Sequence, residues 1–269
     1  MLTALSGIVR EDTKISKKSL KLLRWLDFRL SLLARVERVK CISFPDKKVS
    51  MYFEKQAYQL IGTYLNGEEG ILTVCRHLIK DCDCFVDVGA NRGLFSLSLY
   101  RPGLKKVVCI EPVYSTYLKL LKNIDLNPDV RIQAINAACS NLQGLLRITS
   151  DNDLQNSIVG EGDLRSRKTE LVISVTLDQI YSMFLVPFSP RRVLVKVDVE
   201  RHEMDVIAGA QTLFSSGIEI ILALEFFSAE NKLALAEFLK PFGFIEYMPA
   251  VKSSEDGIDL GDNIIFKNF

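Results

Sequence analysis

Residues 84–93 read CFVDVGANRG, and this stretch decides the fold. Five mostly apolar residues predict a buried strand over 84–88, and glycines follow it directly. Glycine allows the chain to turn tightly out of the strand and allows a ligand to approach the backbone. A helix is predicted next, over 93–100. A buried strand that turns through glycine into a helix is the unit from which doubly wound α/β sheets are built.

Strand and helix signals alternate along much of the remaining chain. The other strands of this pattern are predicted at 106–110, 130–135, 193–197 and 218–224. The other helices are predicted at 68–80, 115–126, 203–214 and 229–239. Apolar strands that alternate with helices indicate a parallel sheet covered on both faces, and therefore a Rossmann-like α/β fold.

The end of the chain departs from this alternation. Strands are predicted at 244–247 and 263–267 with no helix between them, so these two should pair antiparallel. Five parallel strands closed by an antiparallel pair are typical of S-adenosylmethionine-dependent methyltransferases, whereas ordinary dinucleotide-binding folds lack the final hairpin. Two further strands, at 145–149 and 170–176, flank a polar stretch at 150–169, which we expect to form a lid or binding loop.

The N-terminal part of the chain has a different character. Residues 16–40 are predicted to form an amphipathic helix, because leucines recur at spacings of three and four. Residues 1–40 hold ten Lys/Arg and four Asp/Glu, so this end is basic. Two interpretations stand. The helix packs on its own domain or on a second copy in a homo-oligomer, or it makes a peripheral contact with a membrane surface. A short hairpin is predicted at 41–44 and 48–53.

The composition bounds the class of protein. The net charge is +1 over 269 residues, so no global field favours nucleic acid or membrane. The sequence shows no apolar run of about 18 residues and no secretory leader, which makes the cytoplasm the simplest compartment. Of the six cysteines, Cys109 and Cys139 are expected in the core, while Cys82 and Cys84 are too closely spaced for a usual zinc half-site. We divide the chain into an N-terminal extension at 1–80 and a methyltransferase domain at 81–269.

The turn after the first strand is the candidate cofactor site. The free N–H groups of the following helix suit a carboxylate, and S-adenosylmethionine has a methionine carboxylate to place. Asp87 can hold the ammonium group of that methionine, directly or through water. Glu111 ends the second strand, 24 positions later, where an acid can accept both ribose hydroxyls. The residues expected to bind the cofactor are Asp87, Gly89, Asn91, Gly93, Glu111 and Asn136.

The competing interpretation is an NAD-dependent oxidoreductase. NAD binding requires G-x-G-x-x-G, whose second glycine lets the pyrophosphate approach the backbone. Asn91 occupies that position here, and only G-x-x-x-G remains. Together with Asp87, Glu111 and the terminal hairpin, this departure favours a methyltransferase over an oxidoreductase.

The sequence resembles the FkbM-type methyltransferase family in four segments. They are Asp87–Gly93, Glu111-Pro112 with Leu121–Ile124, Thr176–Asp178, and Lys196–Glu200 with Glu203 and Gly209-Ala210. The resemblance spans most of residues 60–225, and the first 40 residues lie outside it. It implies a class I methyltransferase sheet with strand order 3-2-1-4-5-7-6. It also implies O-methylation, commonly of sugar or polyketide hydroxyls.

One position departs from the family pattern. The family usually reads D-x-E-G-x-E over the segment that begins at Asp198, and this chain has Arg201 in place of the glycine. The departure puts either the local backbone or the acceptor pocket in question. Arg201 either holds an anionic acceptor or points to solvent.

The acceptor site is expected beyond the carboxyl ends of the fourth and fifth strands, where ligands of open α/β sheets bind. The candidate catalytic residues that follow or end these strands are Asp198, Glu200, His202 and Glu225. Methyl transfer to a hydroxyl requires alignment and the removal of a proton. We expect Asp198 to orient acceptor or cofactor, with His202 or Glu200 as the base. Lys196 shares a strand face with Asp198 and is expected to form a structural ion pair.

Three alternatives stay open. Mg²⁺ held by Asp198 and Glu225 would acidify a diol acceptor, since that ion prefers oxygen ligands, although we expect no metal. Methylation of RNA ribose would require a lysine on the strand at 218–224, which has none, so we expect a small-molecule or glycan acceptor and no nucleic acid. A catalytically inactive scaffold that binds the cofactor and acts through its N-terminal helix is the third, and the acids at several strand ends argue against it.

Overall fold

The computed structural model describes residues 38–44, 46–53, 69–150, 158, 168–225, 229–248, 260 and 263–269. Most of the helix expected at 16–40, and most of the loop expected at 150–169, lie outside these residues. The expected helix was wrong at its end, because residues 38–40 belong to a strand. None of the described helices is both long and apolar enough to cross a membrane.

The central sheet has seven strands in the order β11-β12-β10-β9-β3-β4-β5. Their bounds are β3 Cys84–Val88, β4 Lys106–Ile110, β5 Gln133–Ile135, β9 Arg192–Val197, β10 Glu219–Glu225, β11 Ile245–Glu246 and β12 Asn263–Lys267. Five strands run parallel, namely β5, β4, β3, β9 and β10. Strand β12 runs antiparallel to both of its neighbours, β10 and β11. Numbered along the chain, this is the order 3-2-1-4-5-7-6, so the expected class I methyltransferase sheet is confirmed.

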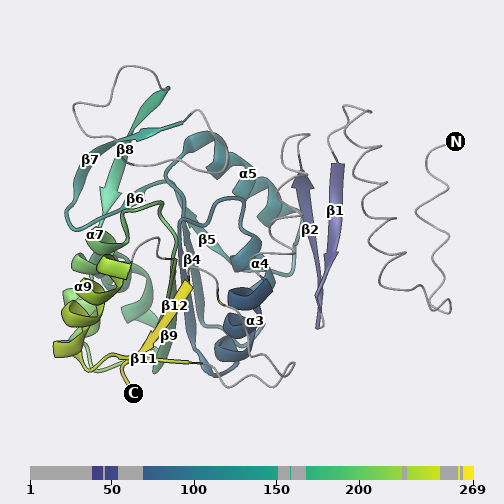
Figure 1. Cartoon of the computed structure of the whole chain (residues 1–269). Coiled ribbons are helices and arrows are strands. Elements are labelled where there is room, and N and C mark those ends of the chain that lie inside the picture. The colour runs from purple at the N-terminus through teal and green to yellow at the C-terminus, as the bar shows by residue number, and fades with distance from the viewer. Residues whose placement is uncertain are drawn as a thin grey trace, which may run out of the picture.

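Helices cover both faces of this sheet (Figure 1). One layer holds α3 Glu69–Leu78, α4 Leu94–Leu99 and α5 Tyr114–Asp125. The other holds α6 Leu177–Ile180, α7 Glu203–Ala208, α8 Gln211–Phe214 and α9 Ala229–Leu239. Because side chains alternate along a strand, Val86 faces the α6–α9 layer while Phe85 faces α3 and α4. The same alternation directs Asp87 and Lys196 to the α4 side.

A second, smaller sheet lies over the start of α5 (Figure 1). It consists of β6 Ala138–Cys139, β8 Thr169–Val175 and β7 Gly144–Thr149, in that order. Its inner face packs Ile148 and Val172 against Val113, at the entrance to α5. The two longer strands were expected from their sequence. The two-residue β6 was not, because it is too short to show a period.

An N-terminal hairpin lies beside α4 and α5 (Figure 1). Its strands are β1 Arg38–Ser43 and β2 Lys48–Phe53, which pair antiparallel. The expected hairpin is therefore confirmed. Its inner face packs Ile42, Val49 and Met51 against Leu94 and Leu97 of α4.

Two further expected elements were wrong in extent, and the helix α6 was also missed. The helix expected at 203–214 is broken into α7 and α8 at Gly209, whose position beside the Ser140 carbonyl oxygen leaves no room for a Cβ. The strand expected at 130–135 begins only at Gln133. The missed helix α6 begins with a capping box, in which Thr176 and Gln179 bond each other's backbone N–H. The spacing T-x-x-Q signals such a start.

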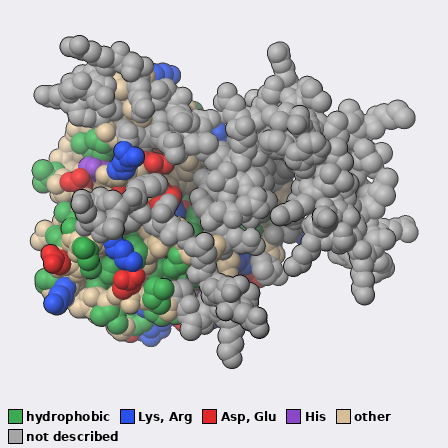
Figure 2. Space-filling model, viewed as in Figure 1, with side chains coloured by type: hydrophobic (Ala, Val, Ile, Leu, Met, Phe, Trp, Pro, Cys, Tyr) green, Lys and Arg blue, Asp and Glu red, His purple; other side chains and the backbone are tan. Residues whose placement is uncertain are grey.

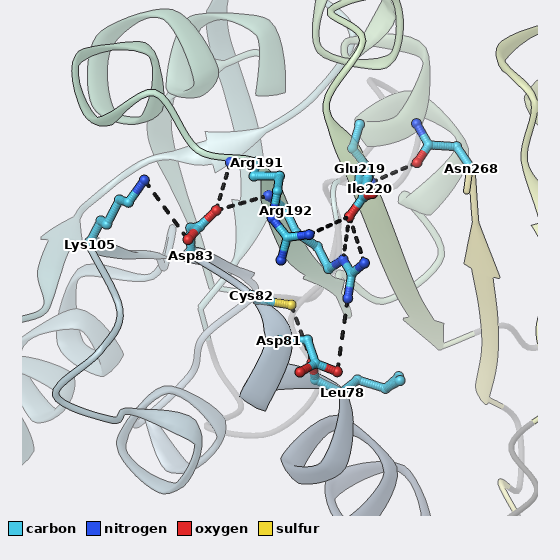
Figure 3. A network of polar contacts seen from close by, with 10 residues as sticks. All are labelled: Leu78, Asp81, Cys82, Asp83, Lys105, Arg191, Arg192, Glu219, Ile220 and Asn268. Carbon is cyan, nitrogen blue, oxygen red and sulfur yellow. Dashed lines mark hydrogen bonds and ion pairs between the residues drawn. The ribbon is translucent and has the colours of Figure 1, made fainter.

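The amino edge of the central sheet is held by opposite charges (Figure 3). The carboxylate of Asp83, just before β3, accepts hydrogen bonds from the backbone N–H groups of Arg191 (2.7 Å) and Arg192 (3.1 Å). The guanidinium of Arg192 donates to one oxygen of Glu219, the first residue of β10, at 2.7 and 2.6 Å. Asn268 completes the edge by accepting a hydrogen bond from the Ile220 N–H. These contacts fix the starts of β3, β9 and β10 relative to each other.

Candidate active site

Polar side chains gather at the opposite edge, where the parallel strands end. Five of the expected site residues stand there, one at or just beyond the end of each strand: Asp87 on β3, Glu111 after β4, Asn136 after β5, Asp198 after β9 and Glu225 on β10. Because the strands are parallel, all of these ends meet at one edge of the sheet. The fold therefore brings together residues that are far apart in the sequence.

The turn between β3 and α4 depends on its glycines. Gly89 has a φ of +76°, and a Cβ there would overlap the carbonyl oxygen of Asp198. Gly93 has a φ of +86° and precedes the first turn of α4. Asn91 adopts a φ of +48°, which asparagine tolerates better than most residues. The backbone of this turn consequently runs close to the end of β9, with the N–H groups of Gly89 and Ala90 both bonded to the Ile110 carbonyl oxygen.

Asp87 is completely buried beneath this turn. Its Oδ2 accepts a hydrogen bond from the Ser96 hydroxyl at 2.7 Å, while its Oδ1 has no hydrogen-bond partner among the described residues. The ammonium group of Lys196 lies 3.8 Å from Oδ1. Burial raises the pKa of Asp87, and Lys196 and Ser96 oppose that rise. An unsatisfied buried carboxylate oxygen favours a cationic or hydrogen-bonding ligand at this point.

Glu111 is the second acid of the candidate cofactor site. Its two carboxylate oxygens accept hydrogen bonds from the backbone N–H groups of Asn91 (2.9 Å) and Val113 (3.0 Å). Burial raises its pKa to about 7, against the effect of these two bonds. Asn136 donates to the carbonyl oxygens of Glu111 and Pro112, at 2.9 Å each, and so fixes the backbone on which Glu111 stands. The side chain of Asn136 itself is exposed.

Lys196 occupies the centre of the edge. Its ammonium group lies 2.9 Å from Oδ2 of Asp198 and 4.5 Å from the centroid of the Phe95 ring. The side chain is 6 % exposed. The expected ion pair on a shared strand face is confirmed. With Asp87 on its other side, Lys196 is the cation that allows two carboxylates to stand so close together.

Asp198 and Glu225 form a carboxyl pair beside Lys196. Burial would raise the pKa of Asp198, but Lys196 and hydrogen bonds from Glu225 and Lys196 outweigh it, so its pKa lies below the ordinary value. Burial and the neighbouring Asp198 raise the pKa of Glu225 to about 9. At neutral pH Asp198 is therefore ionised, and a protonated Glu225 donates a hydrogen bond to it. The pair shares one proton, as expected for two close carboxyl groups.

The segment after Asp198 is strained. Glu200 and Arg201 have φ values of +52° and +74°, a region that residues with a Cβ rarely occupy. The buried carboxylate of Glu203 accepts a hydrogen bond from the Arg201 N–H at 3.1 Å, which helps to hold this turn. Arg201 thus keeps the left-handed backbone that a glycine would adopt without strain. Its side chain is exposed, and no hydrogen bond or ion pair joins its guanidinium to another described residue.

His202 lies at the start of α7, and the partners of its ring nitrogens lie outside the carboxyl pair. Its Nε2 lies 2.9 Å from the Ser140 hydroxyl, and its Nδ1 lies 3.0 Å from a carboxylate oxygen of Asp205. Burial lowers its pKa, and Asp205 opposes the shift. Figure 2 shows a histidine side chain on the face in view, with an acidic and a basic side chain close to it. Both ring nitrogens therefore have partners within the protein. The sequence analysis did not predict that Ser140 and Asp205 would be these partners.

Glu200 has a different environment from His202. Its side chain is half-buried, and burial together with the charges of Asp198 and Glu203 raises its pKa to about 7. Carboxyl groups with such a pKa exchange protons readily near neutral pH.

Among the described residues, there is no group of three or more His, Cys, Asp or Glu side chains that could hold a metal ion.

Three solved structures are similar to part of this chain, at low sequence identity. A precorrin-6y C5,15-methyltransferase from Geobacter metallireducens is 12 % identical, with a TM-score of 0.42, over 76 % of this chain and 88 % of that one. A ribosomal protein L11 methylase from Lactobacillus delbrueckii subsp. bulgaricus is 13 % identical, with a TM-score of 0.40, over 80 % and 78 %. A putative RNA methyltransferase from Pyrococcus horikoshii is 12 % identical, with a TM-score of 0.39, over 75 % and 81 %. No curated protein matches the sequence.

A family comparison covers more than half of the chain. The family described as "Methyltransferase FkbM domain" matches residues 87–246, from Asp87 on β3 to the end of β11. The matched region contains the glycine turn, the carboxyl pair and the strained turn after β9. The chain therefore belongs to the FkbM methyltransferase family.

Proposed function

We propose that this methyltransferase uses S-adenosylmethionine and methylates a hydroxyl group of a small acceptor, such as a sugar or a polyketide. The observation that carries the proposal is the arrangement at the carboxyl edge: a glycine turn flanked by Asp87 and Glu111, next to the Asp198–Glu225 pair. The first group suits a cofactor with an ammonium, a carboxylate and a ribose. The second suits a hydroxyl that must be oriented and lose a proton.

The residues around the glycine turn fit such a cofactor. Asp87 Oδ1, which lacks a hydrogen-bond partner among the described residues, suits the ammonium group. The N-terminal end of α4 carries a partial positive charge, which suits the carboxylate. Each carboxylate oxygen of Glu111 accepts one backbone hydrogen bond and has a further lone pair. With these lone pairs Glu111 would accept hydrogen bonds from the ribose hydroxyls. When bound, S-adenosylmethionine supplies a methyl group on a sulfonium, and the sulfur keeps the electron pair of the broken bond as the methyl joins the acceptor oxygen.

The acceptor side requires an orienting group and a base. Asp198 is ionised at neutral pH, so it accepts a hydrogen bond from the acceptor hydroxyl and holds it in line. Glu200, with a pKa of about 7, takes the hydroxyl proton. His202 is the weaker candidate, because Ser140 and Asp205 already engage both of its ring nitrogens. The protonated Glu225 keeps Asp198 in place through the hydrogen bond that it donates.

Ligand binding tests the cofactor half of the proposal. S-adenosylmethionine and its demethylated product should raise the melting temperature, and NAD should not. Ligand at about 100 times its Kd stabilises the fold by about 2.7 kcal/mol. Glu111→Gln should weaken binding of the demethylated product by about 1–3 kcal/mol, since a charged acceptor is lost. Glu219→Gln, at the opposite edge of the sheet, is the control and should leave binding unchanged. Stabilisation by NAD alone would contradict the proposal.

Transfer of label tests the acceptor half. Methyl-labelled S-adenosylmethionine is incubated with the protein and the small-molecule fraction of a cell extract, and labelled products are identified by mass. With the acceptor so found, Glu200→Gln should lower kcat by about 10²–10⁴-fold and remove the acid limb of the pH profile near pH 7. His202→Ala should cost only a few-fold. The reverse result would make His202 the base, and an absence of any transferred label would support the scaffold alternative.

A further inference from the structure

A buried side chain of α5 joins the N-terminal hairpin to the candidate cofactor turn. Asn123 of α5 is completely buried. Its Oδ1 accepts a hydrogen bond from the Tyr52 N–H of β2 at 2.7 Å, and its Nδ2 donates to the Arg92 carbonyl oxygen at 2.8 Å. One amide group thus joins the edge of the hairpin to the turn that connects β3 and α4.

The hairpin also holds the other end of α4. The ammonium group of Lys47, between β1 and β2, donates hydrogen bonds to the carbonyl oxygens of Leu97 and Tyr100, the latter at 2.6 Å. These carbonyls belong to the last turn of a helix, whose C=O groups lack partners within the helix. Between the two ends, Val49 and Met51 of β2 pack on α4. The hairpin therefore contacts α4 along its length, from the glycine turn to its C-terminal end.

A second asparagine binds the same strand without reaching the turn. Asn127 accepts a hydrogen bond from the Ser50 N–H at 2.9 Å and donates to the Ser50 carbonyl oxygen at 2.8 Å. The outer edge of β2 is thus paired with two asparagine side chains, four positions apart, instead of with another strand. Of these two asparagines, Asn123 is the one that also bonds the backbone of the turn, through the Arg92 carbonyl oxygen.

We propose that the β1–β2 hairpin positions the cofactor turn and that Asn123 is the positioning residue through which it acts. The turn needs such support, because Gly89, Asn91 and Gly93 all have positive φ values and glycines leave the free backbone many conformations. A turn that is already ordered binds its ligand without the entropic cost of ordering it. The proposal for ligand affinity rests on the proposed cofactor site, whereas the ordering of the turn does not.

Hydrogen exchange and binding in the full-length protein test this inference. Asn123→Ala should speed exchange of the amides of residues 89–94 by about tenfold in the absence of ligand, because one neutral hydrogen bond is lost. It should also raise the Kd for the demethylated cofactor by about three- to tenfold. The matched control is Asn127→Ala, which should lower the melting temperature while leaving both quantities within about twofold. A residue that only stabilises the fold changes the melting temperature and not the Kd, since nearly all molecules are folded well below that temperature.

Equal effects of the two variants, or no effect of Asn123→Ala on the turn, would overturn the inference. If Asn123→Ala does not fold, Lys47→Met tests the contact between the hairpin and α4 at the other end of that helix. It should speed exchange across α4 and raise the Kd about two- to threefold, and unchanged exchange would again overturn the inference. If the wild-type protein binds no S-adenosylmethionine, the proposed function fails, while the exchange experiment still tests the hairpin.

Discussion

The two edges of the central sheet carry their charges in opposite ways. At the amino edge three acids stand among three basic residues: Asp81, Asp83 and Glu219 with Lys105, Arg191 and Arg192 (Figure 3). Backbone hydrogen bonds from Arg191 and Arg192, against the effect of burial, lower the pKa of Asp83. The acids at the carboxyl edge are Asp87, Glu111, Asp198, Glu200 and Glu225, and Lys196 pairs with Asp87 and Asp198. There burial raises the pKa of Glu111 and Glu200 to about 7 and that of Glu225 to about 9.

The difference separates a structural cluster from a functional one. Opposite charges that satisfy each other stabilise the start of each strand and leave nothing to bind. Like charges held close together destabilise the fold, and such groups are typical of sites that serve a ligand. Backbone strain follows the same division: of the four described non-glycine residues with positive φ, Asn91, Glu200 and Arg201 lie at the carboxyl edge, and only Ser189 lies elsewhere.

Removing one cation from each edge tests this comparison with the largest expected effect. Lys196→Met leaves the buried Asp87 and Asp198 without their counter-ion, and we expect a loss of about 3–5 kcal/mol in the free energy of unfolding. Arg192→Met removes hydrogen bonds to the partly exposed Glu219, and we expect a loss of about 1–3 kcal/mol. Urea unfolding at pH 7 measures both. Equal losses would show that the carboxyl edge holds no greater electrostatic strain than the amino edge.

The two edges should also respond to pH in opposite directions. Folding raises the pKa of Glu225 from 4.5 to about 9, so its contribution to stability is complete below pH 4.5 and is lost as the pH rises through about 9. Folding lowers the pKa of Asp83 from 3.8, so its contribution is present above that pH and is lost as the pH falls. Glu225→Gln should therefore flatten the decline in stability as the pH rises between about 5 and 9. Asp83→Asn should flatten the decline in stability as the pH falls into the acid range.

Urea unfolding over a series of pH values measures these slopes. A Glu225→Gln curve parallel to that of the wild-type protein would contradict the shared proton of the Asp198–Glu225 pair. Glu225 would then not account for the expected difference in pH response between the two edges.

The smallest effect concerns backbone strain. Arg201→Gly relieves a positive φ of +74°, and the gain outweighs the added freedom of the unfolded chain by up to about 1 kcal/mol. Ser189→Gly, at a φ of +44°, is the control away from the carboxyl edge and should stabilise to a similar extent. If Arg201 contacts the acceptor, only Arg201→Gly should raise the acceptor KM. Unchanged KM in both variants would show that the Arg201 guanidinium serves only the solvated surface.

Local signals explain why so much of the sheet could be predicted. An apolar strand followed by glycine, as at 84–93, reports its own structure within ten residues, and the terminal strands without a helix between them predicted the antiparallel pair. The need for glycine at position 209 could not be predicted in this way, because a Cβ there would overlap the carbonyl oxygen of Ser140, 69 positions earlier. His202 likewise has a partner that the local sequence does not indicate: Ser140, 62 positions earlier, lies 2.9 Å from its Nε2, whereas Asp205 is only three positions away on α7.

By itself, the sequence determined where the strands lie along the chain and which acids stand at or after their ends, because apolar period and glycine turns act over a few neighbouring residues. Only the tertiary structure decided what those acids do. The pKa of a carboxyl group depends on burial and on charges within a few ångströms, and it was folding that placed Lys196 between Asp87 and Asp198, and Glu225 beside Asp198. The same is true of Asn123, which reads in the sequence as an ordinary helix residue and becomes, once β2 and the cofactor turn pack around it, the bond between them.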